Sequence, residues 1–165
     1  MKSGREPMAA IADCGETKVM ISRYLRSIAL TAIVIASMTA TAQANPGKAQ
    51  VFRASNTMEK GVESCAARLQ GKPFLDCVAN EMSKYSTRLA QKGAEIVAPQ
   101  GAPNAAQAAS AVKAAPTPAA AASVLNRVAS VVSGLATSGE RDTRLSYNRI
   151  NQAFARAATI LGSKS

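Results

Sequence analysis

Apolar residues recur at helical spacing in two neighbouring stretches of the chain. In each stretch they follow one another at steps of three and four residues, which places them on one face of a helix. Between the stretches, Gly71 can adopt the left-handed conformation that ends a helix, and Pro73 suits the first turn of the next one. The pattern predicts an antiparallel helical hairpin over residues 45–96, whose first helix follows an unstructured lead-in over 45–56. The apolar positions are Met58, Val62, Cys65 and Leu69, and then Leu75, Val78, Met82, Tyr85 and Leu89.

The C-terminal part of the chain shows the same periodicity in two further stretches. A break at 137–142, which reads TSGERD, separates them. Because no alternating run of β-branched residues indicates a strand, the expected fold class is all-α. The pattern predicts a second antiparallel hairpin over residues 123–165. The apolar positions are Val124, Val128, Val131 and Leu135, widened by Leu125 and Val132, and then Tyr147, Ile150, Phe154, Ala157 and Leu161.

Residues 97–122, between the two hairpins, have a different composition. Half of these residues are alanine, four are proline, and Lys113 carries the only charge. Prolines inside a helix remove a backbone donor and clash with the preceding turn, so the prolines fragment any helix here. A short helix between Asn104 and Ala115 is the alternative, although a helix of that length is marginal alone. The composition favours a semi-stiff linker. The two hairpins would either dock as a loose four-helix bundle or stay separate and form a homo-oligomer that covers their apolar faces.

Residues 1–44 have the layout of a secretory signal peptide. Arg23 and Arg26 precede an uncharged stretch over 27–47, whose first part is apolar and which contains the small-x-small cleavage pattern AQA ending at Ala44. Cleavage there would give a periplasmic or secreted protein. The alternative is that the 27–47 segment stays uncleaved and anchors the protein in the inner membrane.

The first nineteen residues fit a signal peptide poorly. They contain Glu6, Asp13 and Glu16, whereas the basic start of a signal peptide is short and carries few acids. The stretch that begins at Met20 has the expected compact, basic form. Translation is therefore expected to start at Met20 rather than at Met1.

Two cysteines remain after the predicted cleavage, and they are placed symmetrically about a turn. Cys65 and Cys77 each lie six residues from Gly71, so they face each other across an antiparallel hairpin. In an exported protein this predicts a disulfide, which would stabilise the fold by about 3 kcal/mol. Free thiols, a redox pair and metal ligands are the alternatives. The spacing differs from C-x-x-C, and a chain with no histidine and two sulfurs lacks a zinc ligand set.

The charge balance is strongly basic. The chain has 20 Lys and Arg against 10 Asp and Glu, and residues 45–165 retain a formal charge of +8. Such a surface attracts lipid head groups, anionic envelope polymers or an acidic protein, although it also serves solubility alone. Nucleic acid is disfavoured, because the protein is expected to be exported and lacks aromatic residues that could stack on bases near its basic groups. The candidate contacts are Lys84, Arg88, Lys92, Arg141, Arg144, Arg149 and Arg156.

Few residues suggest catalysis. The absence of histidine removes the commonest general base and metal ligand. Ser110 and Lys113 match the S-x-x-K pattern of serine acyltransferases, but the companion S-D-N and K-T-G patterns are missing. Glu59 and Glu63 share a helix face near Lys60, which favours an ordinary solvated surface. No catalytic residue, metal or cofactor is expected.

These features together predict a small exported basic protein of the cell envelope, with a non-enzymatic binding or structural role. One alternative is a membrane-anchored envelope protein that uses an uncleaved 27–47 segment. The others are a cationic protein that acts at a membrane surface and a helical accessory subunit of an enzyme.

Overall fold

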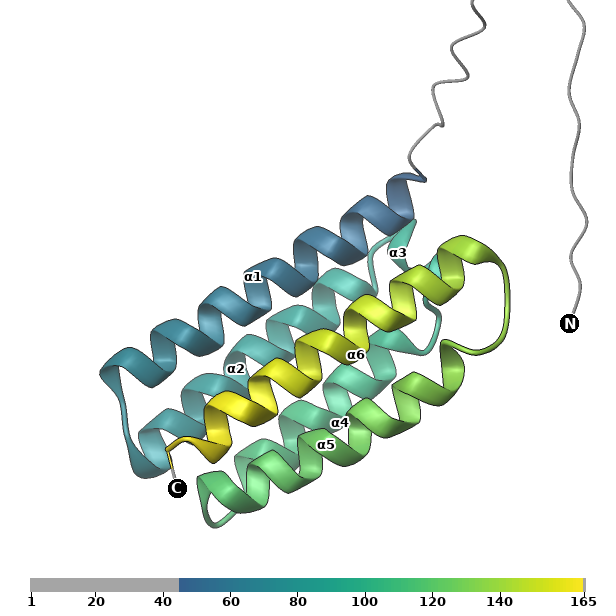
Figure 1. Cartoon of the computed structure of the whole chain (residues 1–165). Coiled ribbons are helices and arrows are strands. Elements are labelled where there is room, and N and C mark those ends of the chain that lie inside the picture. The colour runs from purple at the N-terminus through teal and green to yellow at the C-terminus, as the bar shows by residue number, and fades with distance from the viewer. Residues whose placement is uncertain (1–44, 165) are drawn as a thin grey trace, which may run out of the picture. The chain divides into compact units, whose positions relative to one another are not determined.

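Helix α1 begins earlier than its apolar pattern indicates. The structure, a computed structural model that describes residues 45–164, places α1 over Pro46–Arg68 (Figure 1). Asn45 caps this helix, because its Oδ1 accepts a hydrogen bond from the backbone nitrogen of Gly47 at 3.0 Å. A capping side chain followed by proline in the first turn starts a helix efficiently. The predicted lead-in over 45–56 is therefore wrong, because it forms the first turns of α1.

Helices also make up the rest of the described fold. Each helix begins with a capping residue, with a proline in its first turn or after a turn that contains glycine. No strand occurs within residues 45–164. The all-α prediction is thus confirmed for this part of the chain. The elements after α1 are α2 (Gly71–Leu89), α3 (Ala94–Val97), α4 (Gly101–Ala114), α5 (Pro118–Leu135) and α6 (Arg141–Gly162).

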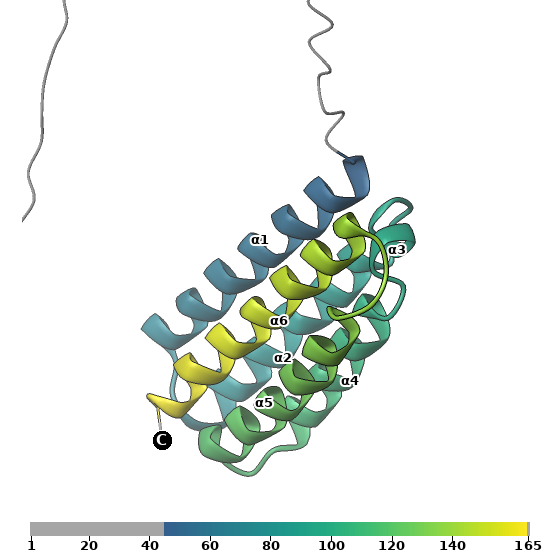
Figure 2. The same cartoon turned by 45° about the vertical axis from the view of Figure 1, so that its right-hand side comes forward.

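The five long helices of the described part pack in two layers. Helices α1, α6 and α5 lie side by side in one layer, and α2 and α4 form the other (Figures 1 and 2). Each long helix packs against the next one along the chain, and α6 also packs against α1. Successive long helices alternate in direction, so α1 and α6, the first and the fifth, run parallel. The contact between α1 and α6 closes the bundle.

Helix α4 corrects the prediction of a linker over 97–122. Ala105, Ala108 and Val112 on α4 are all fully buried, and α4 packs against α2. Alanine is the best helix former, and its small side chain lets neighbouring helices approach closely. A helix of this length is marginal alone, but tertiary contacts stabilise it.

The prolines of this segment do not interrupt its helices. Pro103 lies in the first turn of α4, and Pro118 is the first residue of α5. Pro99 and Pro116 fall in the connections before those helices. Proline is tolerated in the first turn of a helix because the backbone N–H groups there have no intrahelical partner. The same residues that suggest a broken chain therefore mark where two helices start.

The core confirms the apolar series of α2 and α6, whose predicted positions are all buried. In α1 the series is buried except for Leu69, which is partly covered. Across the two layers, the rings of Tyr85 and Phe154 meet edge to face with their centroids 6.0 Å apart. Ser55 Oγ and Tyr85 Oη share a hydrogen bond of 2.8 Å inside this core. These two contacts link α2 to α6 and to α1 inside the core.

Helix α5 is rotated relative to its predicted apolar face. Leu125 and Val132 are fully buried, whereas Val131 is 59% exposed. Helix α5 contains alanines as well as valines, so it is apolar on several faces. The spacing of its apolar residues therefore does not show which face is buried. Ala121 and Ala129 complete the face that packs inward.

The predicted pairing of Cys65 and Cys77 is seen in the structure. The two sulfur atoms lie at disulfide bonding distance, 2.03 Å, and the Cα atoms are 5.9 Å apart. The bond joins the end of α1 to the start of α2. Gly71 has a positive φ of 58°, as expected for the turn, but it is the first residue of α2 rather than the end of α1.

The predictions about the N-terminal region fall largely outside the described residues. These are the signal peptide over 1–44, the start at Met20 and the anchor over 27–47, of which only the last three residues are described. Within residues 45–164, no helix combines the length and the apolar character needed to cross a membrane.

Candidate functional site

Ion pairs between α1 and α6 neutralise three of the seven acidic side chains in the described part. Lys48 of α1 binds Asp142 of α6 at 2.9 Å, and Glu59 of α1 binds Arg149 of α6 at 2.6 Å. The side chains of Glu59 and Arg149 are each only 13% exposed. The prediction that Glu59 lies on a solvated face is therefore wrong, because α6 covers that side of α1.

The next turn of the same interface carries a more exposed pair. Arg156 binds Glu63 through its Nε and Nη2, and the shorter contact is 2.5 Å. The hydrogen bond and the negative charge of Glu63 raise the pKa of Arg156. Glu63 is thus exposed, as expected, but it is not free. The groove that these two pairs line between α1 and α6 has balanced charges.

The seven predicted contact residues therefore divide into two groups. Arg149 and Arg156 are used in the interface with α1, and Lys84 binds Glu81 on its own helix at 2.7 Å. The other four form no ion pair with any residue in 45–164. These are Arg88, Lys92, Arg141 and Arg144.

Arg88 lines a groove in which it meets a second arginine. Arg53 of α1 and Arg88 of α2 line an open depression of about 330 Å³, which we call the Arg53–Arg88 groove. The remaining lining residues are Gln50, Ala54, Thr57 and Gln91. The Nη1 atom of Arg88 is buried and has no hydrogen-bond partner among the described residues. No carboxylate lines the groove.

Sequence reasoning missed Arg53 because it placed this residue in an unstructured lead-in. On α1, Arg53 precedes Thr57 by one turn, and both line the groove with the C-terminal part of α2. The signal was present in the capping pattern of Asn45 and Pro46, which extends α1 far enough to include Arg53.

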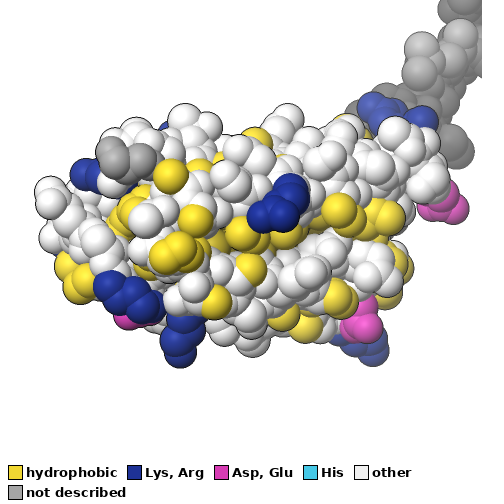
Figure 3. All heavy atoms as spheres, turned by 90° about the horizontal axis from the view of Figure 1, so that it is seen from below, with side chains coloured by type: hydrophobic (Ala, Val, Ile, Leu, Met, Phe, Trp, Pro, Cys, Tyr) yellow, Lys and Arg dark blue, Asp and Glu magenta, His cyan; other side chains and the backbone are white. Residues whose placement is uncertain are grey.

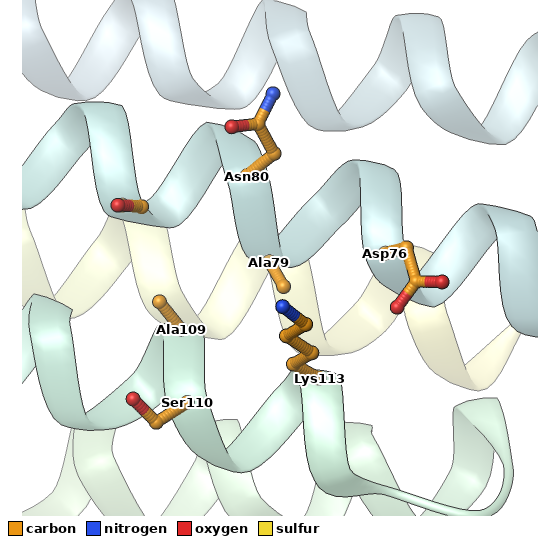
Figure 4. Close-up of a pocket in the computed structure, with 7 residues that line it drawn as sticks. Asp76, Ala79, Asn80, Ala109, Ser110 and Lys113 are labelled. Carbon is orange, nitrogen blue, oxygen red and sulfur yellow. The ribbon is translucent and has the colours of Figure 1, made fainter.

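A second groove, between α2 and α4, contains the S-x-x-K residues (Figure 4). It measures about 440 Å³ and is lined by polar side chains around Ala79 and Ala109. Ser110 Oγ donates to the backbone oxygen of Ala106 at 3.2 Å, and its hydroxyl points away from the Lys113 ammonium in the view of Figure 4. An activated serine requires a base within hydrogen-bond reach. This groove does not supply that geometry.

The face formed by α4 and α5 is poor in charge. Figure 3 shows apolar side chains spread along it, with few charged groups among them. Each of these two helices carries a single charge, Lys113 on α4 and Arg127 on α5. The charges of the described part are therefore concentrated on α1, α2 and α6.

The described residues include no cluster of three or more histidine, cysteine, aspartate or glutamate side chains that could hold a metal ion. Comparison with protein-family models, with curated proteins and with solved structures found no match. The geometry and the charge of the bundle itself are therefore the features that indicate a function.

Proposed function

We propose that the protein is an exported, non-enzymatic binding protein of the cell envelope whose basic surface contacts an anionic partner. The observation that carries this proposal is the positive charge left over after internal pairing. Five of the seven carboxylates in residues 45–164 form ion pairs, whereas most of the basic side chains there form none. Such a surface attracts anions over a distance set by the salt concentration.

Several unpaired cations lie toward one end of the bundle. Arg141 and Arg144 belong to the first turn of α6, which begins beside the start of α1, as the pair of Lys48 with Asp142 shows. Arg88 lies at the end of α2, which runs antiparallel to α1, and Lys92 lies in the turn that follows α2 (Figure 1). An extended anionic partner could contact these groups together.

Export is supported by two independent features. A cleavage after Ala44 would keep Asn45, so the mature chain would retain the residue that caps α1. The disulfide between Cys65 and Cys77 suits an oxidising compartment, because cytosolic thiols are kept reduced. The proposal places the protein in the periplasm or outside the cell.

Cell fractionation of the full-length chain tests the compartment. We expect release of the protein by osmotic shock, at the mass of a chain that begins at Asn45. Recovery only with detergent would favour the anchored alternative instead. Recovery in the cytosolic fraction, with both cysteines alkylated under denaturation before any reduction, would contradict export.

Vesicle binding tests the anionic partner. The purified protein should sediment with vesicles that contain anionic lipid, or be retained by an immobilised polyglutamate, and should be released as salt rises. Exchanging Arg141 and Arg144 for glutamine should weaken this binding. Arg156→Gln is the control, because that guanidinium already binds Glu63. Absence of binding to every anionic probe at low salt would overturn the proposal.

A further inference from the structure

We propose that the Arg53–Arg88 groove is a binding site for a phosphate-type oxyanion. This inference rests on the proposed function and deepens it, because it names one site and one ligand chemistry within the basic surface. A tetrahedral dianion, as free phosphate or as a phosphate monoester, would lie between the two guanidinium groups.

Arg88 carries an unsatisfied hydrogen-bond donor. Arg88 Nη1 is buried, yet it has no acceptor among the described residues. Buried donors in folded proteins nearly always have a hydrogen-bond partner, and a charged donor without one is especially costly. Arg88 lines the groove, so an anion there would supply the missing acceptor once the guanidinium turns Nη1 toward it.

Two like charges line the groove. Arg53 and Arg88 come from adjacent antiparallel helices and line the same depression without a carboxylate. The closest acid along this part of α2 is Glu81, and its carboxylate already binds Lys84. Repulsion between the two arginines is therefore not relieved within the groove. A dianion would neutralise both.

The shape of the two guanidinium groups suits a tetrahedral oxyanion. The planar guanidinium presents a fork of N–H donors that matches two oxygens of a phosphate. A tetrahedral oxyanion can offer one oxygen pair to each wall, whereas a planar carboxylate has only two oxygens to share. The groove volume of about 330 Å³ has room for such a group. Gln50 Nε2 donates to Gln91 Oε1 at 2.5 Å, and this contact ties the two walls together.

Calorimetric titration of the full-length chain with inorganic phosphate tests the site. We expect saturable binding at low ionic strength, weakened about tenfold or more by Arg53→Gln and by Arg88→Gln, which corresponds to the loss of a charge-assisted contact. Lys92→Gln is the matched control, because it removes the same charge one turn beyond Arg88 and outside the groove. It should change the affinity less than about twofold.

Arg88→Lys separates charge from geometry. It keeps the positive charge but loses the fork, so its phosphate affinity should also fall. Circular dichroism of each variant shows whether the bundle is folded. If Arg88→Gln fails to fold, the Arg53→Gln and Lys92→Gln pair alone decides the question.

Vesicles that contain phosphatidate separate the two sources of the phosphate group. If vesicle binding requires Arg53 and is displaced by millimolar phosphate, the ligand is a lipid head group. If only soluble phosphate binds with this requirement, the ligand is a free phosphate or a soluble ester. Both results support the site. Absence of phosphate binding, or equal losses in the Arg53→Gln and Lys92→Gln variants, would overturn it, and general binding to anionic vesicles would still uphold the broader function.

Discussion

Tyr85 is the side chain on which the polar part of the core depends. Its ring is fully buried against Phe154, and its hydroxyl shares a hydrogen bond with Ser55, which is equally buried. Burial raises the pKa of Tyr85 above its ordinary value of 10.0, while the Ser55 hydrogen bond lowers it in part. The folded protein therefore keeps this proton at a pH where the unfolded chain releases it.

This difference predicts a loss of stability at high pH. Below pH 10 the Tyr85 proton is bound in both states, so Tyr85→Phe should destabilise the protein by about 1 kcal/mol through the lost hydrogen bond. Above pH 10 only the unfolded state releases the proton, so by pH 11 the natural protein should lose about 1.4 kcal/mol relative to the variant. The variant should then be the more stable of the two by about 0.4 kcal/mol. Urea unfolding of both proteins at pH 8 and pH 11 measures this. A difference that does not change with pH would contradict the assignment.

The ion pairs between α1 and α6 differ in burial, and they should differ in importance. Arg149→Met leaves the largely buried carboxylate of Glu59 without its partner, and should cost about 1–3 kcal/mol of unfolding free energy. Arg156→Met is the matched control, because the Arg156 and Glu63 side chains are far more exposed. Its effect on the urea midpoint should be much smaller. Equal shifts of the urea midpoint for the two variants would contradict the burial of the Glu59–Arg149 pair.

Helix α4 distinguishes a single packed bundle from two hairpins joined by a linker. As a linker it would tolerate larger side chains everywhere, whereas as a packed helix it tolerates them only on its outer face. Ala105 is fully buried, and its neighbour Ala106 is exposed. These two positions share the same residue type and helix, so they form a matched pair.

Replacing each alanine with leucine tests this packing. Ala105→Leu should overpack the interior and destabilise the protein by about 1–3 kcal/mol. Ala106→Leu should change the unfolding free energy by no more than about 0.5 kcal/mol. Thermal or urea unfolding followed by circular dichroism provides the comparison. If neither substitution changed the unfolding free energy, the result would favour an unpacked linker over a packed helix.

The start of α1 is held close to the turn that follows α2. A Cβ atom added to Gly47 would collide with the backbone oxygen of Gly93, and Gly93 itself has a φ of 106°. This close approach explains why both positions are glycine. It also fixes the first turns of α1, and with them Arg53, relative to the end of α2.

The whole bundle should unfold as one unit, because each long helix packs against the next and the last one packs against the first. Helix α4 joins the two halves along the chain, and the parallel contact of α1 with α6 joins them again. Two hairpins on a linker would instead unfold independently. We expect a single transition, with the same midpoint whether fluorescence of tyrosine or circular dichroism follows it. Separate midpoints would contradict the closed bundle.

Removal of the disulfide should lower the free energy of unfolding of the bundle without unfolding it. Exchanging Cys65 and Cys77 together for alanine should cost about 3 kcal/mol, because the bond closes a short loop in the unfolded chain. The variant should remain helical, since α1 is also held by α6. Urea unfolding of the oxidised protein, the reduced protein and the double variant measures the effect. Loss of helix in the double variant would show that the other contacts are insufficient.

The sequence by itself determined the structural features that depend only on residues within a few helical turns of one another. The apolar faces of α2 and α6 follow from spacing, and the pairing of Cys65 with Cys77 follows from their distance to one turn. These features are local, because the 3.6-residue period of a helix already states which side chains share a face.

Only the tertiary structure decided the features that join distant parts of the sequence. Whether residues 97–122 are linker or helix depended on a surface of α2 against which alanines could pack. Which cations stay unpaired depended on α6 lying beside α1, since Glu59 and Arg149 are 90 residues apart. The same holds for Arg53 and Arg88, which share a groove only because two helices bring them together. Contacts of this kind have no period along the chain, so they emerge only when the helices are packed.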